Sequence, residues 1–302
     1  MAVDVVVVGG SYAGLAAALQ LARARRDVLI VDAGQRRNRD VSHAHGILGH
    51  DGAAPAAIWT QAKAEVLRYP TVQWLDAPAV AARAVAGGFA VDAGGAARTG
   101  KRLILAHGVV DGVPSIPGVR ERWAKTVFHC PYCDGYELER GKLGVLASGP
   151  NAAHYASLVA EWGAPGQTVF FVEAGAPPPD GPEAAALAAR GIRIETEPLL
   201  EAQDAPGGLE LLVRGGRRYP LAALFAMPRT SLPGDFARQL GCETEIVPTG
   251  SIYKTDPRTK ETTVPGVFAC GDAAIAQHSV TYAIADGARA GISAHQSLVF
   301  AP

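Results

Sequence analysis

The feature that most constrains this chain is a strand, glycine turn, helix and strand pattern that occurs twice. The first copy starts with the β-branched run Val3–Val8, broken only by Asp4, which stops at Gly9-Gly10. An Ala- and Leu-rich run with helical spacing follows over residues 13–26, and a second apolar run ends in Asp32. Buried strands of parallel sheets have this composition, and such a succession predicts a βαβ unit.

The second copy has the same layout further along the chain. Its parts are, in order, a strand at 142–146, a turn at 147–151, a helix at 152–162 and a strand at 168–172 followed by Glu173. The 302 residues are enough for two domains. The pattern predicts an α/β protein in which a discontinuous domain, 1–115 plus 247–302, encloses an inserted domain, 116–246. Val113–Pro117 is expected to be a crossing strand.

The first turn, Gly9-Gly10-Ser11-Tyr12-Ala13-Gly14, matches most of a dinucleotide-binding fingerprint. Its first glycine permits a tight turn, and its last lets helix and strand pack closely. Ser11 replaces the second glycine, and a serine fits there only if its φ stays negative. The helix N-terminus offers N–H groups to a pyrophosphate, and Asp32 is placed to accept from ribose hydroxyls. The residues expected to bind the dinucleotide are Gly9, Gly10, Ser11, Ala13, Gly14 and Asp32.

The second turn is a degenerate version of the first, because Ala147 replaces the first glycine. No Lys or Arg lies between Lys142 and Arg190 to hold the 2′-phosphate of NADP, and Glu173 would repel that group. Two interpretations are open. Glu173 binds the ribose of NAD(H), or the domain keeps its fold without a nicotinamide cofactor. The missing glycine and the acidic charge favour the second, and NADH over NADPH if either binds.

Cys130 and Cys133 form a C-x-x-C motif, which closes a disulfide ring and reopens it by thiolate exchange. His129 and Asp134 flank the pair and are placed to move protons as thiolates form. A metal site is the rival interpretation, but a zinc site needs a second ligand pair, and none has the required spacing.

A polar loop with several titratable side chains follows the first βαβ unit. We expect it to be solvated and not to bind a metal; the residues concerned are His43, His45, His50 and Asp51. The formal net charge of −1 provides no basic excess for a nucleic-acid partner. No membrane span and no basic segment of a secretory signal are visible, which predicts a cytoplasmic protein with no membrane partner.

These motifs, in this order, carry a family resemblance. G-x-S-x-A-G at 9–14, C-x-x-C-D-G at 130–135 and G-V-F-A-C-G-D at 266–272 resemble the low-molecular-weight thioredoxin reductases over nearly the whole chain. Arg37-Asn38-Arg39 with His43 and His45, and Cys-Pro-Tyr-Cys, are more similar to FAD-dependent dithiol oxidases of disulfide natural products, of the gliotoxin, holomycin and romidepsin type. The resemblance implies two nested Rossmann-like domains in a homodimer. The outer domain would bind FAD, and the inserted, NAD(P)-like domain would carry the disulfide.

The resemblance also implies roles for single residues. Asp272 of Gly271-Asp272 would place a carboxylate on the ribityl chain of FAD, and the helix starting near His278–Thr281 would direct its N-terminus at the flavin pyrimidine edge. Cys133 would be the thiol next to the flavin, and Cys130 the thiol that exchanges with substrate. The other residues expected at the cofactor are Ala33, Arg37, Asn38, Gly108, Ser279 and Val280.

The chain departs from both branches of this family. The reductases carry a His-Arg-Arg cluster where this chain has Val172-Glu173-Ala174-Gly175, whereas the fungal oxidases carry His where this chain has Asp134. We predict an FAD-dependent dithiol oxidase that forms a disulfide in a small-molecule substrate, with oxygen as acceptor. Its catalytic residues would be Cys130, Cys133, Asp134 and His129. The alternatives are an NAD(P)H- or ferredoxin-driven reductase of thioredoxin-like proteins and a non-catalytic flavin redox sensor.

Overall fold

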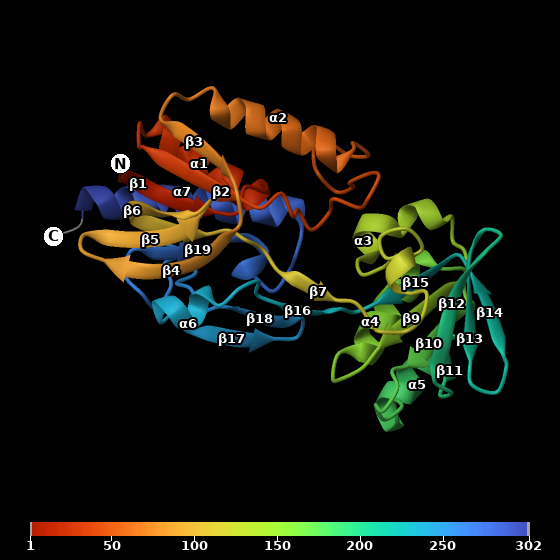
Figure 1. Cartoon of the computed structure of the whole chain (residues 1–302). Helices are drawn as coiled ribbons and strands as arrows, with labels where there is room; N and C mark the ends of the chain where they lie inside the picture. Colours follow the sequence, from red (N-terminus) through yellow and green to blue (C-terminus); the bar gives the residue numbers. More distant parts are fainter. Residues whose placement is uncertain (1, 301–302) are drawn as a thin grey trace. The chain divides into compact units, whose positions relative to one another are not determined.

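The computed structural model describes residues 2–300, which divide into two compact units. Unit 1 comprises the residues up to 43, 47–111 and those from 230 onward, and unit 2 comprises 44–46 and 112–229. The chain therefore leaves unit 1, builds most of unit 2, and returns (Figure 1).

The crossing points differ from those expected from sequence. Apart from the short segment 44–46, the chain passes between units after Asp111 and after Arg229, and residues 230–246 belong to unit 1. Val113–Pro117 forms no strand; the short strand β7 ends before it, at Val110–Gly112. Pro114 and Pro117 have no amide hydrogen for a ladder, which accounts for this end. Phe236 is in unit 1 because it packs into the same buried cluster as Val6 and Leu103.

Unit 1 is built on a seven-stranded sheet. The strand order is β3 (Val72–Asp76), β2 (Val28–Asp32), β1 (Val3–Val8), β6 (Ala96–Leu105), β5 (Gly88–Ala93) and β4 (Ala79–Val85), with β19 (Val267–Ala269) also paired to β6. Strands β3, β2, β1, β6 and β19 pair in parallel. Strands β4, β5 and β6 pair antiparallel and form a meander at one side of the sheet.

Helices cover one face of this sheet. They are α1 (Tyr12–Arg23), α2 (Pro55–Leu67) and α7 (Val280–Phe300), with the short α6 (Phe236–Leu240) placed elsewhere in unit 1. A Cβ on Gly287 would lie 2.0 Å from the Ala13 carbonyl oxygen, and one on Gly291 would lie 2.4 Å from that of Ala17. Glycine is required at both positions because α7 packs backbone to backbone against α1.

The opposite face of the sheet packs against α6 and against a four-stranded sheet. That sheet has the order β17 (Thr244–Val247), β18 (Gly250–Tyr253), β16 (Arg229–Ser231) and β7. Phe236, Cys242 and Tyr253 share one buried cluster with Val8 and Leu105 of the large sheet. Unit 1 is therefore layered, with helices on one face and a second sheet on the other.

Unit 2 repeats this plan on a smaller scale. Its parallel sheet has the order β11 (Arg193–Glu195), β10 (Thr168–Val172), β9 (Leu143–Ala147), β15 (Ala223–Ala226) and β8 (Val127–Phe128). Antiparallel strands β12 (Leu199–Ala205), β13 (Gly208–Val213) and β14 (Arg218–Leu221) form a second sheet. The helices are α3 (Pro131–Asp134), α4 (Ala152–Val159) and α5 (Gly181–Ala189), with short 3₁₀ turns at Arg120–Arg122, Tyr136–Leu138 and Ala160–Trp162.

Alternation along the parallel strands explains the layers of unit 2. Val145 and Phe170 join a buried cluster with residues of α4 and α5, whereas their neighbours Leu146 and Phe171 join a cluster with β12 and β13. Successive side chains of a strand point to opposite faces, so the sheet is buried on both. The expectation of two nested Rossmann-like, three-layer α/β domains is confirmed. In the described part of the chain, no helix has the length and apolar character needed to cross a membrane.

Candidate functional site

The loops that follow the parallel strands of unit 1 gather at one edge of its sheet. Gly9 follows β1, Asp32 ends β2, Gly108 follows β6, and Gly271 follows β19 closely. Carboxyl ends of parallel strands point the same way, and open α/β sheets bind ligands outside that edge. The topology thus brings together segments that are far apart in sequence.

The glycines of the first turn are demanded by close packing. Gly9 has φ +101°, and a Cβ there would lie 2.4 Å from the Ala106 carbonyl oxygen. A Cβ on Gly14 would lie 1.8 Å from the Gly9 carbonyl oxygen. One on Gly10 would overlap the Trp74 ring at 2.2 Å. Each glycine lets backbone approach a neighbour that any side chain would displace.

Ser11 adopts an extended backbone with φ −87°, which is the condition under which a serine can replace the second glycine. Its side chain makes no capping hydrogen bond, and the first turn of α1 holds no acidic residue. The first amide groups of a helix have no intrahelical acceptor and carry partial positive charge. This end of α1, which includes Ala13, is therefore free to receive an anionic group.

The Asp32 carboxylate is fixed against the first turn. The Gly10 amide donates to its Oδ1 at 2.9 Å, and the Gly34 amide donates to its Oδ2 at 3.2 Å. Asp32 is buried, whereas the following Ala33 is exposed. The carboxylate keeps lone pairs for hydroxyl donors beside the helix N-terminus.

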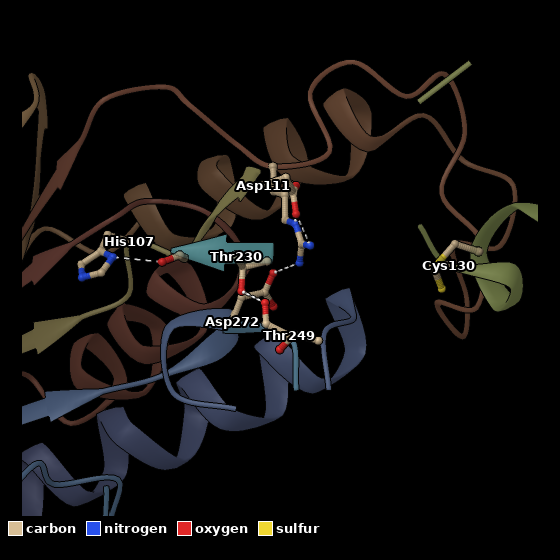
Figure 2. Close-up of polar contacts among 9 residues, drawn as sticks. His107, Asp111, Cys130, Thr230, Thr249 and Asp272 are labelled. Carbon is tan, nitrogen blue, oxygen red and sulfur yellow. Dashed lines mark hydrogen bonds and ion pairs between the residues drawn. A yellow bond between two sulfur atoms is a disulfide. The ribbon is translucent and has the colours of Figure 1, made fainter. Parts of the chain in front are cut away.

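Arg37 bridges two carboxylates of unit 1 (Figure 2). Its Nε and Nη2 donate to Asp111 at 2.9 and 2.6 Å, and its Nη1 donates to Asp272 Oδ2 at 2.9 Å. Burial lowers the pKa of Arg37, but the hydrogen bonds and charges of the two aspartates outweigh it, so the pKa is raised. Asp111 did not emerge from sequence, because nothing near it in the chain indicates a partner.

The Gly271-Asp272 turn is also held by a second ion pair, Lys260–Asp286, which sequence reasoning missed. The Gly271 amide donates to Asp286 Oδ2 at 2.9 Å, and Lys260 Nζ lies 3.2 Å from Asp286 Oδ1. The Lys260 side chain is only 5% exposed. A buried lysine in an apparent surface loop carries no sequence signal until its partner is known.

The other residues expected at this edge have local partners. Asn38 Nδ2 donates to the Tyr12 hydroxyl at 3.3 Å. Gly108 has φ +68°, with open space where a Cβ would stand. Ser279 Oγ accepts from the Tyr282 amide at 3.0 Å and so caps α7, whose first residue is Val280.

In unit 2, the C-x-x-C motif follows the end of strand β8. Cys130 and Cys133 form a disulfide with their Cα atoms 5.3 Å apart, and Cys130 precedes the short helix α3. Cys242 and Cys270 are buried free thiols. Burial raises the pKa of both thiols, so they are poor nucleophiles.

Asp134 is the titratable side chain that follows Cys133 directly. Burial, with the nearby negative charge of Glu137, raises its pKa to about 6, although the charge of His45 opposes this rise. A carboxyl with this pKa gives up and takes back a proton near neutral pH. His129 is arranged differently: its ring stacks on Trp123 at 6.0 Å, and its carbonyl accepts from the Tyr155 hydroxyl at 2.9 Å.

The second glycine turn lies at the same edge of the unit 2 sheet. Ala147 ends β9, and the Ser148 hydroxyl donates to the Glu173 carboxylate, which follows β10. Glu173 thus stands at the end of β10, where the fingerprint has its ribose-binding acid, and its carboxylate already accepts a hydrogen bond from Ser148. Among residues 2–300, no group of three or more His, Cys, Asp or Glu side chains is arranged to hold a metal ion.

Comparison with known proteins identifies the family. The family model for pyridine nucleotide-disulphide oxidoreductases matches residues 3–290. The chain belongs to this family. Thioredoxin reductase sirT of Leptosphaeria maculans is 32% identical over 306 residues, which cover 95% of this chain and 92% of that protein.

Solved structures agree with this assignment. An oxidoreductase from Agrobacterium tumefaciens is 47% identical, with a TM-score of 0.93 and 100% of both chains covered. HlmI is 33% identical, with a TM-score of 0.89 over 99% of this chain and 93% of that one. The resemblance to thioredoxin reductases is confirmed, and the chain is a thioredoxin reductase-like flavoprotein oxidoreductase with FAD as its cofactor.

The residues of unit 1 fit FAD. The uncapped N-terminus of α1 suits a pyrophosphate, and the oriented Asp32 carboxylate suits a ribose. Both lie at the carboxyl edge of the parallel sheet, beside Gly108 and the Gly271-Asp272 turn. The groups that unit 1 brings together are therefore those that FAD, the cofactor expected from the family, requires.

Proposed function

We propose that this protein is an FAD-dependent dithiol oxidase that forms a disulfide in a small-molecule substrate. The observation that carries the proposal is a disulfide followed directly by Asp134, a carboxyl whose pKa is raised to about 6, in a unit whose glycine turn lacks its first glycine. Ala147 replaces the first glycine of that turn, and Glu173 presents a negative charge that is hydrogen-bonded to Ser148. Electrons would therefore enter from a dithiol and not from NADPH.

The exchange chemistry belongs to Cys130 and Cys133. A substrate thiolate attacks Sγ of Cys130, which breaks the Cys130–Cys133 bond, forms a mixed disulfide and releases Cys133 as a thiolate. The second substrate thiolate then attacks the substrate sulfur of that mixed disulfide. This step closes the substrate disulfide and releases Cys130 as a thiolate. The substrate has lost two electrons, and the cysteine pair has gained them.

Asp134 and His129 are assigned to the protons of these steps. Each substrate thiol must lose a proton before it attacks, and Asp134 has a pKa suited to accept one near neutrality. His129 precedes Cys130 directly, and we assign it a secondary role because its ring stacks on Trp123.

Bound FAD supplies the two-electron acceptor that the cysteine pair needs to return to its disulfide. We assign it to the turn residues 9–14, to Asp32 and Ala33, to Arg37 and Asn38, to Gly108, to Gly271-Asp272, and to Ser279-Val280. With dioxygen as the terminal acceptor, one dithiol and one dioxygen give one disulfide and one hydrogen peroxide. A homodimer in the cytoplasm completes the proposal.

A second function is favoured by the similarity to the protein of Leptosphaeria maculans that is named a thioredoxin reductase. In that case the same cysteine pair would reduce a thioredoxin-like protein, with electrons supplied by NADH or a ferredoxin. Glu173 at the end of β10 is compatible with the unphosphorylated ribose of NADH.

Anaerobic stopped-flow reduction of the holoenzyme separates these functions. Dithiothreitol, NADH and NADPH are mixed with the enzyme in parallel, and flavin absorbance is followed. The proposal requires rapid bleaching by dithiothreitol and none by NADPH within the turnover time. Rapid bleaching by a nicotinamide, without bleaching by the dithiol, would overturn it.

The cysteine variants locate the reaction. Cys130→Ser and Cys133→Ser are expected to abolish dithiol turnover and peroxide formation. Cys242→Ser is the matched control, because that thiol is buried and free. Turnover by Cys130→Ser at the wild-type rate would contradict the proposed exchange.

A further inference from the structure

A histidine from a distant loop lies in the unit that carries the disulfide. Residues 44–46 belong to unit 2, although the chain on both sides of them belongs to unit 1. Within this segment, His45 Nε2 lies 3.4 Å from Glu137 Oε1. Glu137 belongs to the 3₁₀ turn Tyr136–Leu138, directly after the motif Cys130–Gly135.

The ion pair acts on Asp134. Glu137 and His45 are the charged groups that shift the pKa of Asp134 among the described residues, and they act in opposite directions. Glu137 favours the protonated carboxyl, because a second negative charge nearby is unfavourable. When its ring is protonated, His45 favours the Asp134 carboxylate and also neutralises Glu137.

We propose that His45 and Glu137 are positioning residues that set the protonation of Asp134 beside the redox disulfide. This inference rests on the proposed function, in which Asp134 carries the protons of thiol–disulfide exchange. In this role both residues act through the Asp134 carboxyl.

His45 and Glu137 differ in how far along the chain they lie from Asp134. Asp134 and Glu137 are three residues apart on successive short helical turns, so the chain fixes their repulsion locally. The compensating charge comes from a segment about ninety residues earlier, and only the fold brings it to Glu137. The basicity of the proton carrier therefore depends on the docking of residues 44–46.

Opposite substitutions predict opposite shifts. His45→Gln removes the compensating charge, so Asp134 should titrate at higher pH. Glu137→Gln removes the repulsive charge, so Asp134 should titrate at lower pH. We expect each shift to be small, about half a pH unit, because both groups are partly exposed and water screens their charges.

The direct test is an NMR titration of the Asp134 carboxyl in the holoenzyme, with isotope-labelled aspartate. Asp134→Asn identifies its signal. His43→Gln and Glu139→Gln are matched controls, because they remove exposed neighbours of the same type. Shifts of opposite sign in the two test variants, with unmoved controls, support the proposal. Shifts of the same sign, or no shift, overturn it, because a merely structural role predicts no reciprocal effect.

A kinetic test shows whether that titration matters for exchange. The rate of flavin bleaching by dithiothreitol is measured against pH for the wild type and each variant and is divided by the thiolate fraction of the reagent at that pH, so that ionisation of the reagent cancels. The acid limb should move up in His45→Gln, down in Glu137→Gln, and disappear in Asp134→Asn. If Asp134→Asn keeps the limb, the role of Asp134 in the proposed function fails, whereas the NMR titration still decides the assignment of His45 and Glu137.

Discussion

The Tyr253 hydroxyl donates a hydrogen bond to His107 Nε2 at 3.1 Å in the interior of unit 1 (Figure 2). The other ring nitrogen, Nδ1, donates to the Gly108 carbonyl at 3.1 Å. Phe236 packs against the same ring, with centroids 5.6 Å apart. This arrangement needs one protonated and one bare ring nitrogen, which is the neutral imidazole.

His107 therefore makes stability depend on acid. Burial lowers the pKa of His107 from 6.5 to about 4. Between pH 6.5 and pH 4 the unfolded chain therefore binds a proton on this ring, whereas the folded protein does not. Stability is then full above about pH 6.5 and falls as the pH drops toward 4, by up to about 3 kcal/mol. Denaturant unfolding at a series of pH values should show a flatter acid limb for His107→Gln. His154→Gln, at an exposed site, should keep the wild-type slope.

Arg37 is expected to stabilise unit 1 because its positive charge bridges two carboxylates that would otherwise repel each other. Arg37→Met leaves Asp111 and Asp272 without their shared cation, and we expect a loss of about 2–4 kcal/mol in unfolding free energy. Adding Asp111→Asn should recover part of that loss, because one of the two charges is gone. A loss no greater than that of Arg39→Met, an exposed neighbour, would mean that the bridge contributes nothing.

Asp32 is expected to govern FAD retention. Asp32→Asn replaces the carboxylate that would accept from ribose hydroxyls, and charged hydrogen bonds of this kind correspond to about 10- to 100-fold in affinity. The dissociation constant for FAD, measured by refilling the stripped protein, should rise by that factor. Asp76→Asn is the control, because Asp76 is the register partner of Asp32 on β3 and is mostly exposed.

Glu173 is expected to exclude NADPH. Glu173→Arg replaces the repulsive charge by one that pairs with a 2′-phosphate, which should raise the ratio of NADPH to NADH affinity about tenfold or more. Fluorescence titration with each nucleotide measures this ratio. Glu183→Arg adds the same charge at an exposed position of α5 and should leave the ratio unchanged. An unchanged ratio in Glu173→Arg would place the nucleotide selectivity elsewhere.

The parts of the fold that sequence predicts best are those specified locally. The run Val3–Val8, the glycines after it and the strand ending in Asp32 occur as expected, because β-branched composition and turn chemistry act over a few residues. The first crossing between the units differs from the expected one, because the apolar, proline-containing run Val113–Pro117 has the composition of a strand, whereas the strand is Val110–Gly112. Its true position depends on which residues pack together, as Phe236 illustrates.

The candidate site follows the same division. The C-x-x-C motif and its Asp134 are adjacent in sequence, so their chemistry is readable there. Arg37 and Asp272 were each expected at the cofactor, but their ion pair and the role of Asp111 depend on long-range contacts. The same holds for His45 and Glu137, whose pairing no local spacing indicates.

The nested arrangement of the units has a consequence for biosynthesis. Strand β19 pairs with β6, and α7 packs against α1 through Gly287 and Gly291, yet both leave the ribosome after all of unit 2. While the disulfide-bearing insert is translated, the first part of unit 1 therefore lacks the partner strand of the end of β6 and the helix that covers α1. We therefore expect the FAD site to be complete only after the Gly271-Asp272 turn has been translated, which is later than all of unit 2.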